Sequence, residues 1–195
     1  MSETSASVDL YWIPLGAGAN VVRISGRIFE ALSAFAARRP PFDLYHSALI
    51  VSVSEGRFVV EQAPVPTADG ASRGVVADGP VGTRCAGRFR IFRYEVRRWR
   101  EGQIPDLEAA IDGPIRVSSS LSCARRLLDV LGEIPTPVWG RDEFDTGEMW
   151  NSNSVVSWAL TRSGIDTSRI APPEGGRAPG WHAGIAVAQQ HDALA

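Results

Sequence analysis

The chain has 195 residues, of which 44% are hydrophobic and 22% charged, and its formal net charge is -2. This length and balance predict one globular domain over residues 1–195 and exclude a disordered chain or a fibrous repeat. A charge of -2 gives no whole-molecule attraction to nucleic acid or to anionic lipid, so either partner would need a local basic patch.

The start of the chain predicts a cytoplasmic product. Residues 1–8 are short, polar and acidic, whereas a secretory signal begins with basic residues and continues with an apolar run. No stretch approaches the roughly 18 apolar residues that a membrane span needs. Cys85 and Cys123 lack the CxxC spacing of metal sites, and a cytosol would keep them reduced. We therefore expect no disulfide, no metal and no other cofactor.

The first half of the chain predicts a strand, a helix and a strand pair. Residues 9–15 have the composition of a short strand, and Gly16 ends it. A helix then follows, because apolar residues recur at a spacing of three and four at Ile24, Ile28, Leu32 and Phe35. Residues 45–53 and 57–62 are β-rich segments on either side of a short turn with a glycine, which predicts a hairpin.

A long polar passage separates this hairpin from the next strand. Residues 63–88 contain several prolines and glycines, which favours an ordered surface loop or a lid. Residues 89–96 predict a strand, although the alternation changes parity between Ile91 and Phe92. The change indicates a bulge or burial on both sides.

The last part of the chain predicts two helices. Residues 120–131 place leucines and alanine on one face of a helix, and the loop of residues 139–150 leads to a further helix that begins near Ser152. Helices and antiparallel strands are interleaved without a repeating βαβ unit. The predicted fold class is therefore α+β, with an antiparallel sheet packed against helices.

Small polar residues mark the start of the helix near Ser152. The run from Asn151 to Val156 passes from Asn and Ser to an apolar stretch. The unpaired N–H groups and the dipole of a helix N-terminus stabilise negative charge on a nucleophile or an oxyanion. Simple N-capping is the structural alternative, because Ser and Asn are also preferred caps.

This run resembles the nucleophile motif of papain-like hydrolases of the NlpC superfamily, with Ser152 in place of the catalytic cysteine. The permuted branch, which includes the lecithin:retinol acyltransferase-like proteins, carries its histidine on an upstream strand and a polar third residue on the next strand. The segments around His46 and Glu61 are similar to these in order and character. The resemblance implies a circularly permuted papain-like fold acting on an amide or ester of a small-molecule, lipid or peptide substrate. Ser152 would attack the carbonyl, His46 would act as the base and Glu61 would orient the imidazole.

Several alternatives stay open within this interpretation. A serine hydroxyl has essentially no anion near neutral pH, so the chain could be a catalytically silent relative that binds a ligand or a protein partner. Ser154 offers a second hydroxyl two positions further on. His182 lies in a segment that resembles the His-x-Gly-Ile strand of the unpermuted branch, and it is the second candidate base.

The hairpin register also bears on the proposed triad. A two-residue turn at Glu55 and Gly56 would pair His46 with Val65 and leave Glu61 roughly 13 Å along the strand. Contact between His46 and Glu61 therefore requires a bulge or a looser turn.

Two charged segments have a structural and a functional interpretation each. The arginines between Arg84 and Arg100 alternate with aromatic residues, a pattern that single-stranded nucleic acid binding uses. We favour a solvated sheet face paired with Glu95, Glu101 and Asp106, and so predict no nucleic acid partner. The acidic residues before Ser152 lack EF-hand spacing, which predicts an acidic loop formed by Asp142, Glu143, Asp145 and Glu148.

Overall fold

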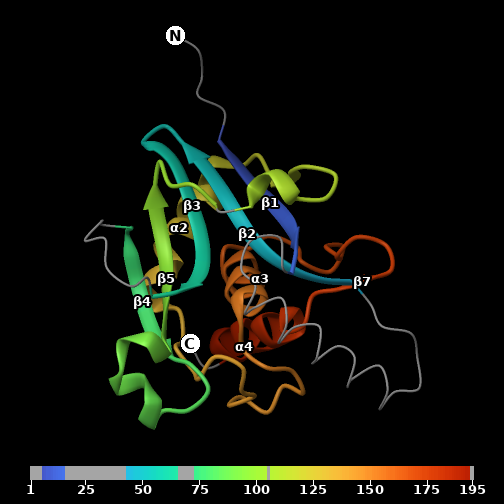
Figure 1. Ribbon diagram of the computed structural model, residues 1–195. Helices are drawn as coiled ribbons and strands as arrows, with labels where there is room; N and C mark the ends of the chain where they lie inside the picture. The colour runs from blue at the N-terminus through green and yellow to red at the C-terminus, as the bar shows by residue number, and fades with distance from the viewer. Residues whose placement is uncertain (1–5, 16–42, 66–72, 105, 194–195) are drawn as a thin grey trace.

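The structure is a computed structural model that describes residues 6–15, 43–65, 73–104 and 106–193 (Figure 1). The helix predicted around Ile24 lies outside the described residues. Every helix in the described part of the chain is too short or too polar to cross a bilayer.

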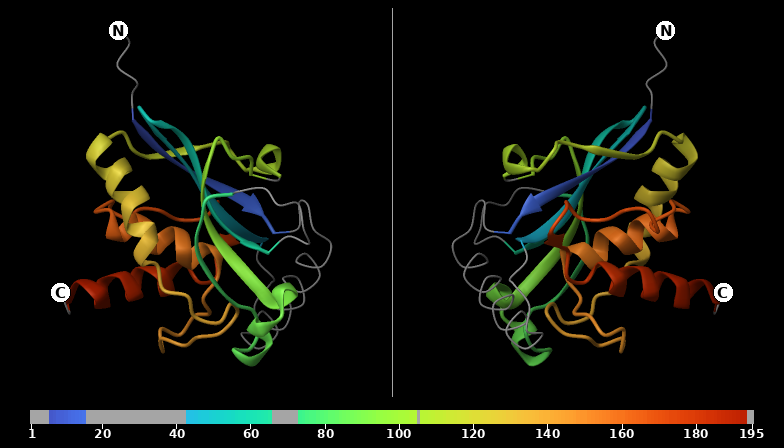
Figure 2. Two further views of the ribbon diagram at one scale, coloured as in Figure 1. Left: turned by 90° about the vertical axis from the view of Figure 1, so that its left-hand side faces the viewer. Right: turned by 90° about the vertical axis from the view of Figure 1, so that its right-hand side faces the viewer.

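The fold is α+β, as the sequence predicted. The described α-helices lie on one face of a twisted sheet, and Figure 2 shows this layering from both sides. The strands lie in the order β4-β5-β3-β2-β1-β6, with bounds Ser7–Pro14 (β1), Asp43–Val53 (β2), Gly56–Pro64 (β3), Val75–Pro80 (β4), Arg93–Arg100 (β5) and Ile115–Ser118 (β6). The neighbours along this path are antiparallel, while the two-residue strand β7 (Gly176–Arg177) pairs in parallel with the start of β2.

Three helices are described, together with four short 3-10 turns. The helices are α2 (Leu121–Val130), α3 (Ser152–Arg162) and α4 (Trp181–Ala193). The 3-10 turns are η1 (Cys85–Arg88), η2 (Arg90–Phe92), η3 (Leu107–Ala109) and η4 (Leu131–Glu133). Ser120 caps α2 by accepting a hydrogen bond from the N–H of Cys123, so this helix begins where the sequence predicted.

The two faces of the sheet carry different apolar clusters. Side chains alternate along β2, so Leu49 and Val51 point one way and Ala48 and Ile50 the other. Leu49 and Val51 belong to the main core, which also contains buried residues of α2, α3 and α4. Ala48 and Ile50 belong to a smaller cluster on the opposite face with Ile13, Val59 and Ile104. This division decides which side chains can meet the helix that carries Ser152.

The hairpin register differs from the one considered above. Val53 pairs with Gly56, so the two turn residues are Ser54 and Glu55, and Gly56 has a φ of 136° that favours glycine. The ladder between β2 and β3 runs from this turn to the pair Leu49 and Val60. Beyond that pair, β3 continues its pairing with β5, and β2 with β1.

Two segments differ from their predicted structure. Residues 63–88 were expected to form a loop, but they include β4, which pairs with β5. The strand predicted over 89–96 begins only at Arg93, because residues 90–92 form the turn η2. The parity change between Ile91 and Phe92 therefore marks the end of a turn and not a bulge in a strand.

Helix α4 was not predicted, and its packing explains why its sequence is unusual for a helix. Gly184 lies against α3 so closely that an added Cβ would be 2.1 Å from both the Ser154 carbonyl oxygen and the Ser157 Oγ. A glycine lowers helix propensity, yet it permits the two helix backbones to approach. The close packing of α4 against α3 therefore outweighs the low helix propensity of Gly184.

Candidate functional site

Helix α3 begins at Ser152, as predicted, and Asn151 is its N-cap. The Asn151 side chain accepts a hydrogen bond from the N–H of Asn153 at 2.9 Å. Ser154 completes a capping box, since its hydroxyl accepts from the N–H of Asn151 at 3.1 Å. The polar run therefore does perform the capping that the structural alternative proposed.

Buried polar residues in the first turns of α3 hold neighbouring segments together. The Asn153 amide donates to the carbonyls of Tyr45 and Pro179, at 3.0 and 2.9 Å, and its oxygen accepts from the Ser47 hydroxyl at 2.9 Å. Ser154 donates to the carbonyl of Gly180 at 2.8 Å. The hydroxyl of Ser154 is thus fully buried and engaged in structure, which leaves Ser152 as the accessible hydroxyl at this end of α3.

His46 lies on the opposite face of the sheet from α3. The ladder between β1 and β2 is regular from Ser52 to Tyr45, so the alternation of β2 continues without a bulge. Ser47 reaches Asn153 in α3, and its neighbour His46 must therefore share the face of Ala48. The structure does not bring His46 and Ser152 together on one side of the sheet.

The surroundings of His46 favour a neutral imidazole. Burial lowers the pKa of His46, and the nearby Asp106 carboxylate opposes this shift. Asp106 precedes η3, which lies over the face of the smaller apolar cluster. This agrees with the side of the sheet that the strand alternation assigns to His46.

Glu61 belongs to a buried ion-pair network with Arg97. The Arg97 guanidinium donates to Glu61 at 3.0 Å and to Glu95 at 3.0 Å, and also to the carbonyl of Pro64 at 3.2 Å. The side chains of Arg97 and Glu61 are only 7% and 10% exposed. Burial raises the pKa of Glu61, while Arg97 and Arg73 oppose the shift. The partner of Glu61 is therefore an arginine on β5.

His182 occupies the first turn of α4, not the strand that its sequence resembled. Its backbone N–H donates to the carboxylate of Glu148 at 3.2 Å, and its side chain is exposed. The start of α4 lies close to the start of α3, because Asn151 donates to the carbonyl of Pro179 at 2.8 Å. His182 is thus on the same side of the sheet as Ser152.

The acidic loop before α3 uses its carboxylates in local structure. Asp142 accepts hydrogen bonds from the N–H groups of Thr146 and Gly147, which lower the pKa of Asp142. Glu143 pairs with Arg84 at 2.8 Å. Across residues 6–15, 43–65, 73–104 and 106–193, no cluster of His, Cys, Asp and Glu is arranged to hold a metal ion. Both cysteines are free thiols.

Most arginines of the strip from Arg84 to Arg100 are engaged with protein groups, though not always as predicted. Arg93 pairs with Asp78, and Arg98 donates to the carbonyl of Leu128 at 2.9 Å. Arg97 does pair with Glu95, but this pair is buried and not solvated.

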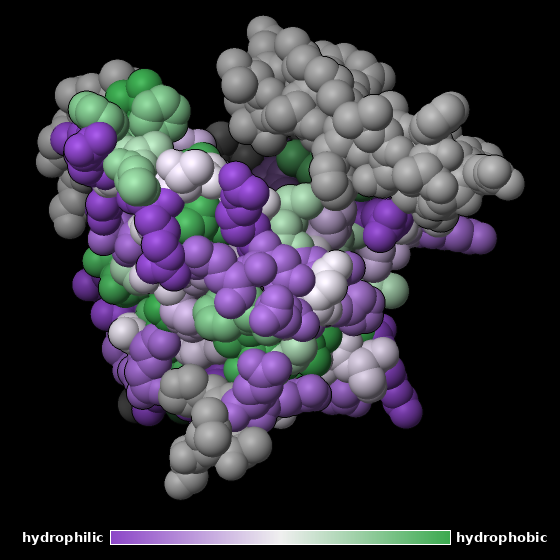
Figure 3. Space-filling view, turned by 90° about the horizontal axis from the view of Figure 1, so that it is seen from below, coloured by the Kyte–Doolittle hydropathy of each residue, from purple (hydrophilic) through white to green (hydrophobic). Residues whose placement is uncertain are grey.

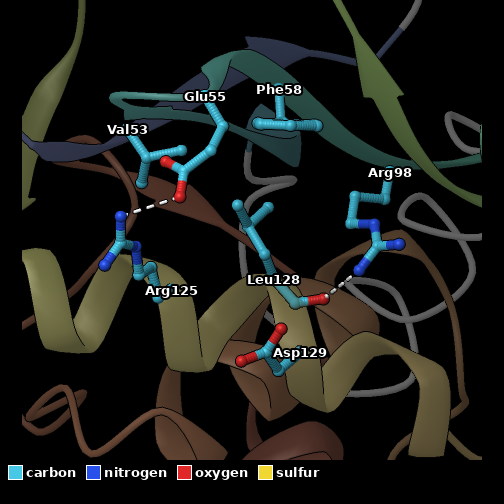
Figure 4. Close-up of a pocket in the computed structure, with 7 residues that line it drawn as sticks. All are labelled: Val53, Glu55, Phe58, Arg98, Arg125, Leu128 and Asp129. Carbon is cyan, nitrogen blue, oxygen red and sulfur yellow. Dashed lines mark hydrogen bonds and ion pairs between the residues drawn. The ribbon is translucent and has the colours of Figure 1, made fainter.

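A pocket of about 260 Å³ lies between the hairpin turn, β5 and α2 (Figure 4). Its apolar lining is formed by Val53, Phe58 and Leu128, and its charged lining by Glu55, Arg98, Arg125 and Asp129. Sequence reasoning did not find this pocket, because its residues come from three segments that only the fold brings together. The one signal was the position of Arg98 in the arginine strip.

Neither a family model, nor a curated protein, nor a solved structure matches this chain.

Proposed function

We propose that this chain is a ligand-binding protein whose site is the pocket between the hairpin, β5 and α2, and that Ser152 is not a nucleophile. The carrying observation is that this pocket is lined both by groups of either charge and by apolar side chains. Binding sites commonly combine an apolar lining with a few well-placed polar groups. The order of strand, strand and helix around His46, Glu61 and Ser152 supports a permuted papain-like ancestry for such a silent relative.

Of the four charged residues in the pocket lining, two pair with each other and the other two have polar groups available for a ligand. Arg125 and Glu55 pair across one side at 2.7 Å. On the other side, Arg98 uses one nitrogen to bind the Leu128 carbonyl, which fixes the guanidinium and leaves further N–H groups for an incoming acceptor. Within the described chain the Asp129 carboxylate forms no hydrogen bond or ion pair, so it can accept from a cation.

These two available groups favour a small zwitterion. A fixed guanidinium suits a carboxylate, and a free carboxylate suits an ammonium group. The apolar lining of Val53, Phe58 and Leu128 would contact an apolar side chain. A free amino acid with an aliphatic or aromatic side chain has these three features, and its size fits a pocket of about 260 Å³.

We expect leucine and phenylalanine to bind with a Kd of about 1 mM or tighter in titrations followed by NMR or calorimetry. Isovalerate lacks the ammonium group and isoamylamine lacks the carboxylate, so both should bind at least about tenfold more weakly. Arg98→Gln and Asp129→Asn should each weaken leucine binding, whereas Arg100→Gln, on the same strand outside the pocket, should not. Equal binding of the analogues, or no binding of either amino acid, would refute the proposed ligand class.

A serine hydrolase is the second candidate, and the position of Ser152 favours it. Ser152 is a half-buried first residue of α3, and no described side chain hydrogen-bonds its hydroxyl. A nucleophile at a helix N-terminus would benefit from the helix dipole. The base would then be His182 and not His46, since of these two histidines it is His182 that lies on the α3 side of the sheet.

A serine-directed fluorophosphonate probe separates the two candidates. If the chain is a binding protein, the wild type, Ser152→Ala and Ser154→Ala should all remain unlabelled. Labelling of the wild type that is lost in Ser152→Ala would establish the hydrolase instead. Loss of that labelling in His182→Ala, with His46→Ala still labelled, would then identify the base.

A further inference from the structure

A compact projection between β4 and β5 exposes three large apolar side chains. We call residues 81–92 the tip; it includes η1 and η2 and extends beyond the ends of both strands (Figure 1). Phe89, Ile91 and Phe92 are 55%, 75% and 43% exposed. In the space-filling view, apolar and strongly hydrophilic residues lie together at the upper left corner (Figure 3). Adjacent exposed apolar residues of this size usually mark an interaction surface.

The fold holds the tip in one conformation. The N–H of Val81 donates to the carbonyl of Phe92 at 2.8 Å, which closes the base of the tip. Arg93 donates to the carbonyl of Gly87 at 2.8 Å, and Gly87 is buried against Pro80. The tip is therefore a fixed element of the fold, and its apolar side chains are held in solvent instead of collapsing onto the core.

The tip is also positively charged. Residues 81–92 contain three arginines and no acidic residue, although the whole chain has a net charge of -2. Arg84 is paired with Glu143 of the acidic loop. Arg88 lies over the Phe89 ring at 5.3 Å, and in the described part of the chain neither Arg88 nor Arg90 forms an ion pair. These two cations flank the exposed apolar residues.

We infer that the tip docks on an anionic lipid surface. Apolar side chains flanked by cations suit the bilayer interface, where rings and aliphatic groups enter the acyl boundary and guanidinium groups stay with the phosphates. Anionic headgroups complement Arg88 and Arg90. Single-stranded nucleic acid fits less well, since Ile91 is the most exposed of the three and has no π face on which a base can stack.

Cosedimentation of the full chain with phospholipid vesicles tests this inference. Vesicles of phosphatidylcholine with about one-third phosphatidylserine should bind the wild type, and binding should weaken as salt is added. Vesicles of phosphatidylcholine alone should bind at least about tenfold more weakly, because each arginine near an anionic surface contributes a factor of about five.

Two variants separate the apolar and the charged contributions. Phe89→Ser with Ile91→Ser should reduce binding at least about tenfold, because two inserted side chains are lost. Arg88→Gln with Arg90→Gln should reduce it roughly 30-fold and remove most of the salt dependence. The matched controls change exposed residues elsewhere: Ile115→Ser with Leu121→Ser, and Arg100→Gln with Arg126→Gln. Both controls should bind like the wild type.

Three results would overturn the inference. The first is no binding to the phosphatidylserine vesicles. The second is that Phe89→Ser with Ile91→Ser binds as well as the wild type, or that both control variants lose as much binding as the tip variants. The third is tighter binding to a single-stranded oligonucleotide, or a dimer in sedimentation velocity that Ile91→Ser dissociates. Either form of the third result would assign the tip to a different partner.

Discussion

Arg97→Met should lower the free energy of unfolding by about 3–5 kcal/mol at neutral pH, the usual effect of removing one partner of a buried ion pair. The Arg97 guanidinium is the shared partner of Glu61 and Glu95, and all three side chains are largely buried. Methionine would replace the length of the side chain but not its charge, so two carboxylates would remain together in a poorly solvated site. Urea unfolding followed by tryptophan fluorescence measures the loss.

The pH dependence of this loss identifies its cause. Burial raises the pKa of Glu61, and Arg97 opposes that shift more strongly than Arg73 does, so its removal would leave the shift largely unopposed. A carboxyl group with a higher pKa in the folded protein than in the unfolded chain takes up protons on folding, so the folded state gains stability as the pH falls. The deficit of Arg97→Met should therefore be largest above the raised pKa of Glu61 and should shrink as the pH falls toward the ordinary carboxyl range.

Arg100→Met is the matched control, because Arg100 is on the same strand and is exposed. It should change stability by less than about 0.5 kcal/mol. A deficit for Arg97→Met that equals this control, or that is the same at neutral and acidic pH, would contradict the buried network.

Asn153→Ala should cost about 3 kcal/mol, since one side chain links β2, α3 and the segment before α4. The substitution would remove this partner from the carbonyl of Tyr45 and the hydroxyl of Ser47 in a buried site, while the carbonyl of Pro179 would keep its hydrogen bond from Asn151. Asn153→Asp should be at least as costly, because the carboxylate can still accept from Ser47 but cannot donate to the two carbonyls.

Ser152→Ala is the control for this second prediction. Its hydroxyl is not part of the described hydrogen-bond network, so the variant should stay within about 0.5 kcal/mol of the wild type. Thermal or urea unfolding of the three variants gives the comparison. If Ser152→Ala were as destabilised as Asn153→Ala, the division between a structural Asn153 and an accessible Ser152 would be wrong.

The sequence predicted the elements whose signals are local. The hairpin, the helix predicted over residues 120–131 and the start of α3 at Ser152 follow from turn residues, helical periodicity and polar residues within a few positions. Helix α4 was missed because Gly184 has a poor intrinsic helix propensity, and its value lies in a contact with α3. Strand β4 was missed because its pairing with β5 is tertiary information.

The candidate site was harder to predict than these elements, because it too depends on tertiary contacts. The order of His46, Glu61 and Ser152 along the chain suggested a shared cleft, but whether strand residues meet a helix depends on parity, and a shift of one residue changes the face. His46 differs from Ser47 by one position, and it is Ser47 that contacts α3. The pocket at Arg98 and Asp129 carried no local signal beyond the position of Arg98 in the arginine strip, because its walls come from the hairpin, β5 and α2.

The placement of β1 affects how the chain can fold during its synthesis. This first strand lies between β2 and β6, and the Trp12 ring packs against Trp181 of the last helix with 5.0 Å between ring centroids. Contacts between residues so far apart in sequence form slowly, because a long loop must close before they contribute. Strand β1 therefore leaves the ribosome well before β6 and α4, and the Trp12 side of β1 stays uncovered until nearly the whole chain has been made. Completion of the sheet and its helical cover is thus a late event, and a chain stopped before α4 would expose an aromatic surface of the kind that molecular chaperones bind.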